Sequence, residues 1–173
     1  MTTNLWRPLA RLVMRVVGEQ LRSHPATPQP SARPRAASTA AGDYPGCPEM
    51  VFGRTGPGGY RSGEVVWTWV AFEEDASQGK DRPVLLVGSD AEQLLGLPAT
   101  SQDHDRDAEQ ERRAGRYWVD IGQGSWDSQG RASEVRLDRI VRVDPASIRR
   151  IAGRVPHEVF AQVKAGVTRH WDD

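Results

Sequence analysis

Apolar residues gather in short runs in the middle of the chain, and two of these runs predict the strands of a hairpin. Residues 64–72 and 83–87 are rich in β-branched and aromatic side chains, which suit a half-buried sheet. The polar residues 73–81 between them contain a glycine, as hairpin loops commonly do. Residues 93–100 predict a third strand or a short helical turn, and we favour the strand.

The same alternation returns in the second half of the chain. Residues 116–121, 133–137 and 140–143 predict further short strands, separated by the polar stretches 101–115 and 122–130. Several short strands with loops between them indicate a small, strongly bent barrel.

The C-terminal residues carry helix signals. Asp144 and Pro145 provide an oxygen acceptor and a proline for a first turn, which predicts a short helix to Ile151 that Gly153 ends. A last helix follows, and its apolar stripe consists of Val155, Val159, Phe160, Val163 and Val167. We expect residues 169–173 to be a frayed tail. The predicted fold is therefore a β-rich α+β fold.

Residues 1–22 predict an amphipathic helix. An apolar stripe that includes Leu5 and Leu9 opposes a line of arginines at positions 7, 11 and 15. This helix is too short and too charged to span a bilayer. We favour a helix that docks on its own domain or on a second subunit, or an extension without a role. A membrane-surface helix through residues 5–22 is the less favoured alternative.

Residues 23–59 predict a disordered linker, because Pro, Ala, Ser, Thr, Arg and Gly dominate and large apolar side chains are scarce. The glycines at 53–59 lack the Gly-Lys-Ser/Thr ending of a phosphate-binding loop. The folded domain is expected at residues 60–168.

Charge and cysteine content restrict the function. The 173 residues have no formal net charge, but residues 1–46 carry +4 and the remainder carries −4. A mildly acidic folded part does not suit a non-specific nucleic-acid binder, so RNA binding would need a local basic patch. Cys47 is the single cysteine, which excludes an intramolecular disulfide and a zinc knuckle and agrees with a cytoplasmic protein.

Four stretches in order resemble the MazF/PemK toxin family. They are residues 63–67 (GEVVW), 77–85 (SQGKDRPVL), 100–102 (TSQ) and 133–144 (SEVRLDRIVRVD). The resemblance spans about residues 61–168. It implies an SH3-like barrel with appended C-terminal helices that forms a homodimer and cuts single-stranded RNA without a metal or cofactor. It also implies a cognate antitoxin that blocks the site and a toxin–antitoxin complex that binds DNA.

The resemblance also implies a catalytic pair, Arg82 and Thr100. RNA carries its own nucleophile, the 2′-hydroxyl, so the protein has to position the strand and stabilise charge on the phosphate. A guanidinium binds two phosphate oxygens at once and stays protonated, and a threonine hydroxyl adds an oriented donor. RNA-binding residues are expected at Ser77, Gln78, Asp81, Ser101, Gln102 and Trp126. Trp126 is included because a tryptophan in a polar loop suits base stacking, whereas Trp67 and Trp69 are interpreted as core.

Several acidic residues leave alternatives open. Glu73, Glu74 and Asp75 lie in the same loop as the expected RNA-binding residues Ser77 and Gln78, and they would repel phosphate unless they point away. A catalytically inactive regulatory or scaffold module, tethered by the N-terminal helix, is therefore the alternative function. The acids and His104 within residues 103–107 are interpreted as an ion-paired loop rather than a metal site or a general base. The arginines at 112, 113, 116, 131, 136 and 139 are a candidate basic patch or an ordinary solvated surface.

Overall fold

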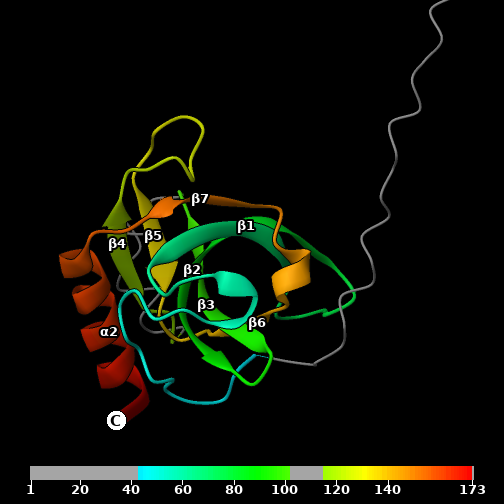
Figure 1. Ribbon diagram of the computed structural model, residues 1–173, viewed down its shortest axis with the longest axis horizontal. Helices are drawn as coiled ribbons and strands as arrows, with labels where there is room; N and C mark the ends of the chain where they lie inside the picture. Colours follow the sequence, from blue (N-terminus) through cyan, green and yellow to red (C-terminus); the bar gives the residue numbers. More distant parts are fainter. Residues whose placement is uncertain (1–42, 102–114, 173) are drawn as a thin grey trace, which may run out of the picture. The chain divides into compact units, whose positions relative to one another are not determined.

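The main feature of the computed structural model, which describes residues 43–101 and 115–172, is a seven-stranded β-sheet (Figure 1). These residues belong to one compact unit. The elements in chain order are η1 (Pro57–Gly59), β1 (Glu64–Ala71), β2 (Gly79–Asp90), β3 (Gln93–Thr100), β4 (Trp118–Gly122), β5 (Ser133–Arg136), β6 (Val141–Val143), η3 (Pro145–Ser147), β7 (Arg150–Arg154) and α2 (His157–Asp172). The predicted N-terminal helix and residues 23–42 of the predicted linker lie outside the described residues.

All strand pairs in the described sheet are antiparallel, in the order β4-β5-β3-β2-β1-β7, with β6 paired to β3. Strand β3 has two partners on one edge: residues 94–96 pair with β6, and residues 99–100 pair with β5. A mostly antiparallel sheet with a C-terminal helix is thus confirmed. Within the described residues β4 and β7 end the sheet as edge strands, so the sheet is open and an SH3-like barrel stays a prediction.

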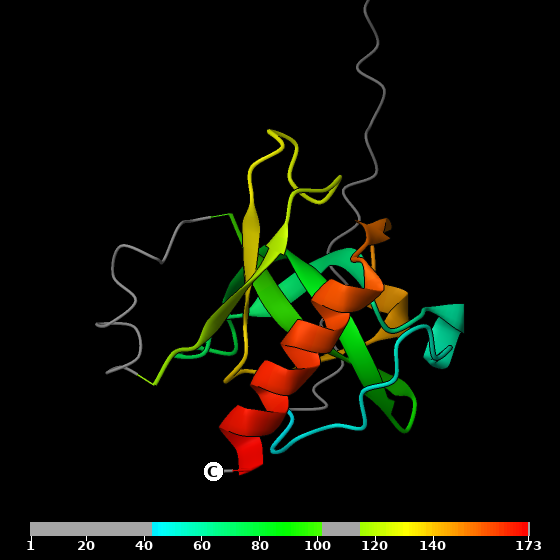
Figure 2. The same ribbon diagram turned by 90° about the vertical axis from the view of Figure 1, so that its left-hand side faces the viewer.

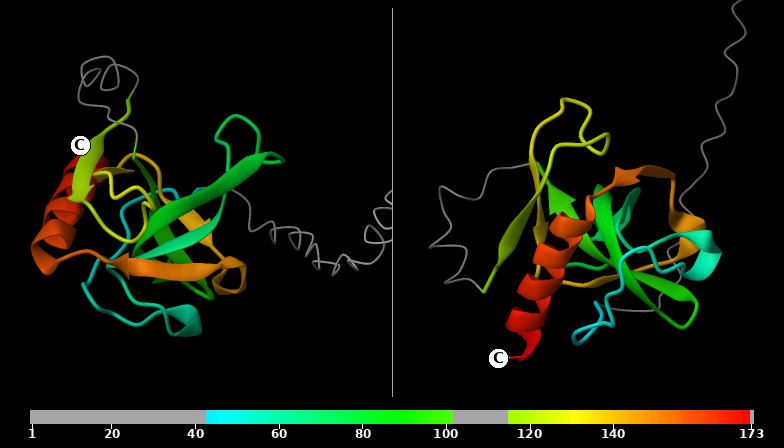
Figure 3. Two further views of the ribbon diagram at one scale, coloured as in Figure 1. Left: turned by 90° about the horizontal axis from the view of Figure 1, so that it is seen from above. Right: turned by 60° about the vertical axis from the view of Figure 1, so that its left-hand side comes forward.

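The β1–β2 hairpin is buried on both faces. Val65 pairs with Leu85 and Val66 with Val84, and the first pair enters a core beneath α2 while the second enters a separate apolar cluster. Burial on both sides explains why residues 84–87 are apolar without alternation. The connection at residues 72–78 closes with a hydrogen bond from the Phe72 amide to the Gln78 carbonyl, 2.9 Å long. Figure 3 shows this turn projecting from the sheet.

The C-terminal helix α2 lies beside β4 in both views (Figures 1 and 2). Phe160, Val163 and Val167 are fully or almost fully buried, which confirms this part of the predicted apolar stripe. Val159 is partly buried, and Val155 is buried but precedes the helix. The prediction of a frayed tail from residue 169 is wrong up to Asp172, because the helix continues there. Trp171 anchors this last turn by donating its indole N–H to the Leu137 carbonyl at 3.2 Å.

The stretch between β6 and α2 differs from the prediction. Asp144 does begin a helical turn, since its side chain accepts a hydrogen bond from the Ala146 amide at 2.9 Å. That turn, η3, ends at Ser147, however, and the predicted helix to Ile151 is replaced by strand β7. The free edge of β1 supplies the reason, because β7 pairs with it.

Residues 43–59, assigned to the linker from composition, are also placed against the sheet. Met50 is 2% exposed in the main core, and Phe52 packs edge-on against Phe160 with ring centroids 5.4 Å apart. Tyr44 packs on the same core and donates its amide to the Ile140 carbonyl at 2.6 Å. Three separated apolar side chains are enough to fix this segment, although its composition gives no periodic signal.

Candidate active site

A small open pocket of about 100 Å³ lies where β2, β3, β4 and β5 meet the loop that follows β1. It brings together the two predicted catalytic residues, Arg82 and Thr100. The pocket is lined by Phe72, Glu73, Glu74, Arg82, Pro98, Ala99, Thr100, Trp118, Arg136 and Arg139. Three arginines and two glutamates therefore line the same pocket as Thr100.

The register of two neighbouring strands explains why Arg82 meets Thr100. Val84 of β2 pairs with Pro98 of β3, and the same antiparallel register carried two residues further sets Arg82 opposite Thr100. On its other side Arg82 pairs with Thr68 of β1, which is completely buried. The arginine backbone is thus held between two strands, and its half-buried side chain reaches the pocket.

The electrostatic surroundings of Arg82 concentrate positive charge. Burial lowers the pKa of Arg82 below its ordinary value, and the nearby guanidiniums of Arg139 and Arg136 lower it further, while Glu74 acts in the opposite direction. None of the described carboxylates forms an ion pair with Arg82. An arginine stays protonated at neutral pH in spite of such a shift. Arg82 is therefore a cation that no described carboxylate neutralises through an ion pair.

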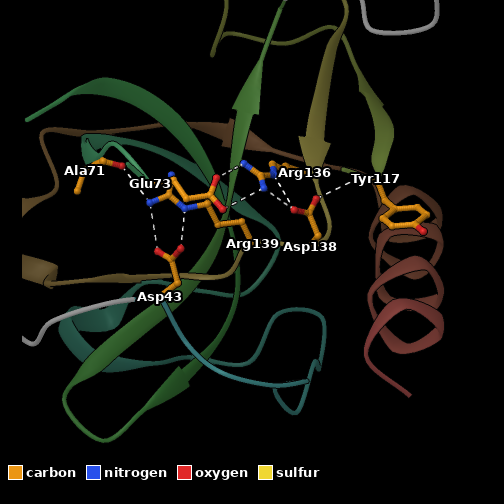
Figure 4. Close-up of polar contacts among 7 residues, drawn as sticks. All are labelled: Asp43, Ala71, Glu73, Tyr117, Arg136, Asp138 and Arg139. Carbon is orange, nitrogen blue, oxygen red and sulfur yellow. Dashed lines mark hydrogen bonds and ion pairs between the residues drawn. The ribbon is translucent and has the colours of Figure 1, made fainter. Parts of the chain in front are cut away.

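The other two arginines of the pocket already have anionic partners (Figure 4). Arg139 binds both oxygens of Asp43, at 2.8 and 3.2 Å, and also donates to the Ala71 carbonyl at 3.0 Å. Arg136 donates to Asp138 through Nε at 2.8 Å and to Glu73 through Nη1 at 2.7 Å. Burial disfavours the charge of Arg136, but the hydrogen bonds to Asp138 and Glu73 outweigh burial and raise its pKa.

The three acidic residues after β1 have different orientations. Glu73 points into the pocket, where its hydrogen bond with Arg136 lowers its pKa. Glu74 also lines the pocket. Asp75 turns back on its own loop, accepting hydrogen bonds from Ser77 through its amide at 2.9 Å and its hydroxyl at 2.6 Å, and from Gln78 at 2.7 Å. Two of the three acids therefore line the pocket, and Asp75 does not.

Most other residues predicted to bind RNA lie outside the pocket. The side chains of Ser77 and Gln78 bind Asp75, and Asp81 forms an ion pair with Arg149 at 2.9 Å. Ser101 directly follows Thr100, and its side chain hydrogen-bonds to Asp127. Gln102 and the acidic loop 103–107 lie outside the described residues.

Family comparison gives the decisive observation. The family model for the PemK-like, MazF-like toxin of type II toxin-antitoxin systems matches residues 61–170, which is more than half of the chain. The chain belongs to this toxin family. The family assignment made from the four sequence stretches is thereby confirmed, and members of the MazF-like family are endoribonucleases.

Solved structures similar to this PemK/MazF-family chain include two from Deinococcus radiodurans. MazF (Form-I) is 22% identical with a TM-score of 0.43, over 62% of this chain and 92% of that chain. A MazE–MazF structure (Form-III) is 18% identical with a TM-score of 0.42 and the same coverage. The Mycobacterium tuberculosis toxin MazF-mt6 is 15% identical with a TM-score of 0.41, over 62% of this chain and 96% of that one. The comparison with curated proteins gives no match. Within the described residues, no helix has the length and apolar character needed to cross a membrane.

Trp126 does not have the exposed position expected of a base-stacking residue in this toxin-family chain. It is 3% exposed and belongs to the main core, where its carbonyl accepts a hydrogen bond from the Trp67 indole at 3.2 Å. The polar composition of residues 122–130 suggested exposure, but the loop folds this one large side chain inward. We therefore withdraw Trp126 as an RNA-binding residue.

Two aromatic residues of the pocket were not among the RNA-binding residues assigned from the sequence. Trp118 on β4 is half-buried and pairs directly with Arg136 on β5, and both line the pocket. Phe72 lines it from the end of β1. The alternation of residues along 116–121 and 133–137 could have placed Trp118 and Arg136 on sheet faces, but only the strand pairing shows that they meet.

Proposed function

We propose that the chain is an endoribonuclease toxin that cleaves single-stranded RNA without a metal ion, with Arg82 and Thr100 as its catalytic pair. The observation that carries this proposal is that both residues line one pocket, with Arg82 lacking an ion pair among the described residues. Family membership supports the RNA substrate.

The reaction needs little chemistry from the protein. The 2′-oxygen of the RNA loses its proton to solvent and attacks the adjacent phosphorus. The bond to the 5′-oxygen breaks, and that oxygen takes up a proton from solvent. The products are a 2′,3′-cyclic phosphate and a 5′-hydroxyl, so protons balance and no water is consumed. Arg82 would bind the non-bridging oxygens and hydrogen-bond to the leaving 5′-oxygen, while the Thr100 hydroxyl donates to the phosphate as its negative charge develops.

We further propose the partners and assembly that belong with this activity. They are a cognate antitoxin protein, a homodimer of this chain with an SH3-like barrel in each subunit, a toxin–antitoxin complex that binds DNA, and a cytoplasmic location. The support is that the matching family consists of toxins of type II toxin-antitoxin systems.

A second function is favoured by the acids in the pocket. Glu73 and Glu74 both line it, and Glu73 neutralises Arg136. If these carboxylates exclude RNA, the chain is a catalytically inactive regulatory or scaffold module.

Incubation of the purified full-length chain with mixed-sequence single-stranded RNA in EDTA separates the two functions. We expect cleavage that Arg82→Ala and Thr100→Val each lower about a hundredfold or more, as loss of one oriented charge-stabilising contact does. Arg54→Ala is the matched control, because Arg54 is exposed, pairs with Glu49 and does not line the pocket. Intact RNA, together with no growth arrest on expression, would favour the inactive module.

A further inference from the structure

Arg136 binds two carboxylates that differ in exposure and in their other hydrogen bonds (Figure 4). The side chain of Asp138 is 9% exposed, binds the Nε side of the guanidinium and also accepts the Tyr117 amide at 3.1 Å. The side chain of Glu73 is 51% exposed and comes from the loop after β1. Its only hydrogen bonds to described residues are those with Arg136, at 2.7 and 3.4 Å. Asp138 is therefore a fixed partner of Arg136, whereas another anion can displace the Glu73 carboxylate.

The three arginines of the pocket differ in how far their guanidinium groups are already bound by other residues. Arg139 is 11% exposed, and its Nε and Nη2 groups donate to Asp43 and to the Ala71 carbonyl. Arg82 has no ion pair among the described residues. Arg136 is intermediate. Among the described residues its Nη1 donates to Glu73 alone, whereas its Nη2 is shared between Asp138 and Glu73. Two guanidiniums in one pocket can thus receive an anion.

We propose that the Nη1–Nη2 edge of Arg136 is a second phosphate-binding subsite beside Arg82, and that the Glu73 carboxylate occupies it until RNA binds. The inference rests on the proposed function, since the phosphate belongs to a single-stranded RNA. A phosphodiester presents two anionic oxygens to a guanidinium in the same forked arrangement as a carboxylate does. RNA binding then exchanges one anion on Arg136 for another.

Trp118 makes this subsite suitable for a nucleotide rather than for a free anion. It pairs with Arg136 across β4 and β5 and lines the same pocket, which places an indole next to the guanidinium. Single-strand binders combine cationic groups for the backbone with aromatic side chains for the bases. Arg136 and Trp118 together provide both.

The exchange has a measurable cost. RNA has to displace Glu73 from Arg136, and the displaced carboxylate remains near the phosphate. Because a half-exposed ion pair contributes little, the cost is small. Removing the charge of Glu73 should tighten RNA binding about fivefold, which corresponds to ~1 kcal/mol.

The test measures binding without cleavage. The probe is a fluorescent mixed-sequence oligonucleotide with 2′-O-methyl groups throughout, which lacks the nucleophile, titrated against the full-length chain at one fixed salt concentration. We expect Glu73→Gln to bind about fivefold tighter than the natural chain. The matched control is Glu49→Gln, an exposed carboxylate that pairs with Arg54 outside the pocket, and it should leave affinity unchanged.

Two further variants show whether the effect runs through Arg136. Glu74→Gln removes a pocket charge that, among the described residues, forms no ion pair with Arg136, and it should tighten binding less than Glu73→Gln. In the background Arg136→Gln/Asp138→Asn, which neutralises the nearly buried pair together, Glu73→Gln should have no effect once thermal unfolding has shown that the protein folds. The subsite is refuted if Glu73→Gln leaves affinity unchanged in the natural background, or if Glu74→Gln matches it.

The proposed function fails in a different way. If the chain binds the probe with the expected dependence on Glu73 but leaves ordinary RNA uncut, the subsite is supported and the catalytic proposal is refuted. If the chain cuts RNA but its affinity for the probe does not depend on Glu73, the catalytic pair is supported and the subsite is refuted.

Discussion

Gly79 is the position where a single added methyl group should disturb the pocket most. It begins β2, pairs with Ala71 and closes the loop that carries Glu73. A Cβ atom there would lie 2.4 Å from the Val70 carbonyl oxygen and 2.5 Å from Cζ2 of Trp69, closer than real Cβ atoms approach. The first obstacle is backbone, so Gly79→Ala has to move β1 and β2 apart at the loop.

The expected cost is that of an overpacked site, about 1–3 kcal/mol. At roughly 3–4 °C per kcal/mol for a domain of this size, the unfolding temperature should fall by about 3–12 °C. The loop shift should also separate Glu73 from Arg136 and change the pocket next to Arg82. Thermal unfolding followed by circular dichroism measures the first effect, and RNA cleavage at a temperature where the variant is folded measures the second.

A second glycine in the same strand is the control. A Cβ on Gly88 would meet its nearest neighbour, the Glu49 carbonyl oxygen, at 3.2 Å, so Gly88→Ala requires a shift of only a few tenths of an ångström. We expect Gly79→Ala to be clearly the less stable of the two. Equal unfolding temperatures, or full cleavage by Gly79→Ala, would refute the reasoning.

Three further predictions concern the core, the aromatic residues and pH. Phe160→Ala should lower the free energy of unfolding in urea by about 3–5 kcal/mol, because the ring is 2% exposed between α2 and the sheet; a loss below 1 kcal/mol would contradict this packing. Trp118→Ala should weaken binding of the 2′-O-methyl probe, whereas Trp126→Phe should not, and the opposite order would show that Trp126 contacts RNA. The Arg136 hydrogen bond lowers the pKa of Glu73 below its ordinary value of 4.5, so its stabilisation is present above pH 4.5 and is lost as the pH falls through the lowered pKa. Urea unfolding should therefore show the natural chain more stable than Glu73→Gln, by up to ~1 kcal/mol, near neutral pH, and the difference should vanish in acid.

The elements that sequence analysis found are those whose burial follows a period. Strands β1, β2 and β3 and helix α2 each contribute a continuous or periodic set of buried side chains. Strand β7 gives no such signal, because only Ala152 is buried and Ile151 is 53% exposed. Its conformation comes from pairing with β1, a long-range contact that local composition does not encode.

In the candidate site, too, residues within recognisable motifs could be predicted, whereas long-range contacts could not. Arg82 and Thr100 could be assigned because they belong to motifs that resemble those of the family, and the β2–β3 register then brings them into one pocket. The partner of Arg136 could not be predicted, since Glu73 lies 63 residues away along the chain. The burial of Trp126 could not be predicted for a related reason, because a single buried side chain in a polar loop produces no periodic pattern.

The most direct test of the account is cleavage of an RNA oligonucleotide that carries one 2′-deoxy sugar at the position where the natural chain cuts. The account predicts that the ordinary oligonucleotide is cut in EDTA to a 2′,3′-cyclic phosphate and a 5′-hydroxyl, and that the 2′-deoxy oligonucleotide stays intact at that bond. It also predicts that Arg82→Ala cuts the ordinary oligonucleotide about a hundredfold more slowly or worse. Cleavage of the 2′-deoxy bond, or undiminished cleavage by Arg82→Ala, would contradict it.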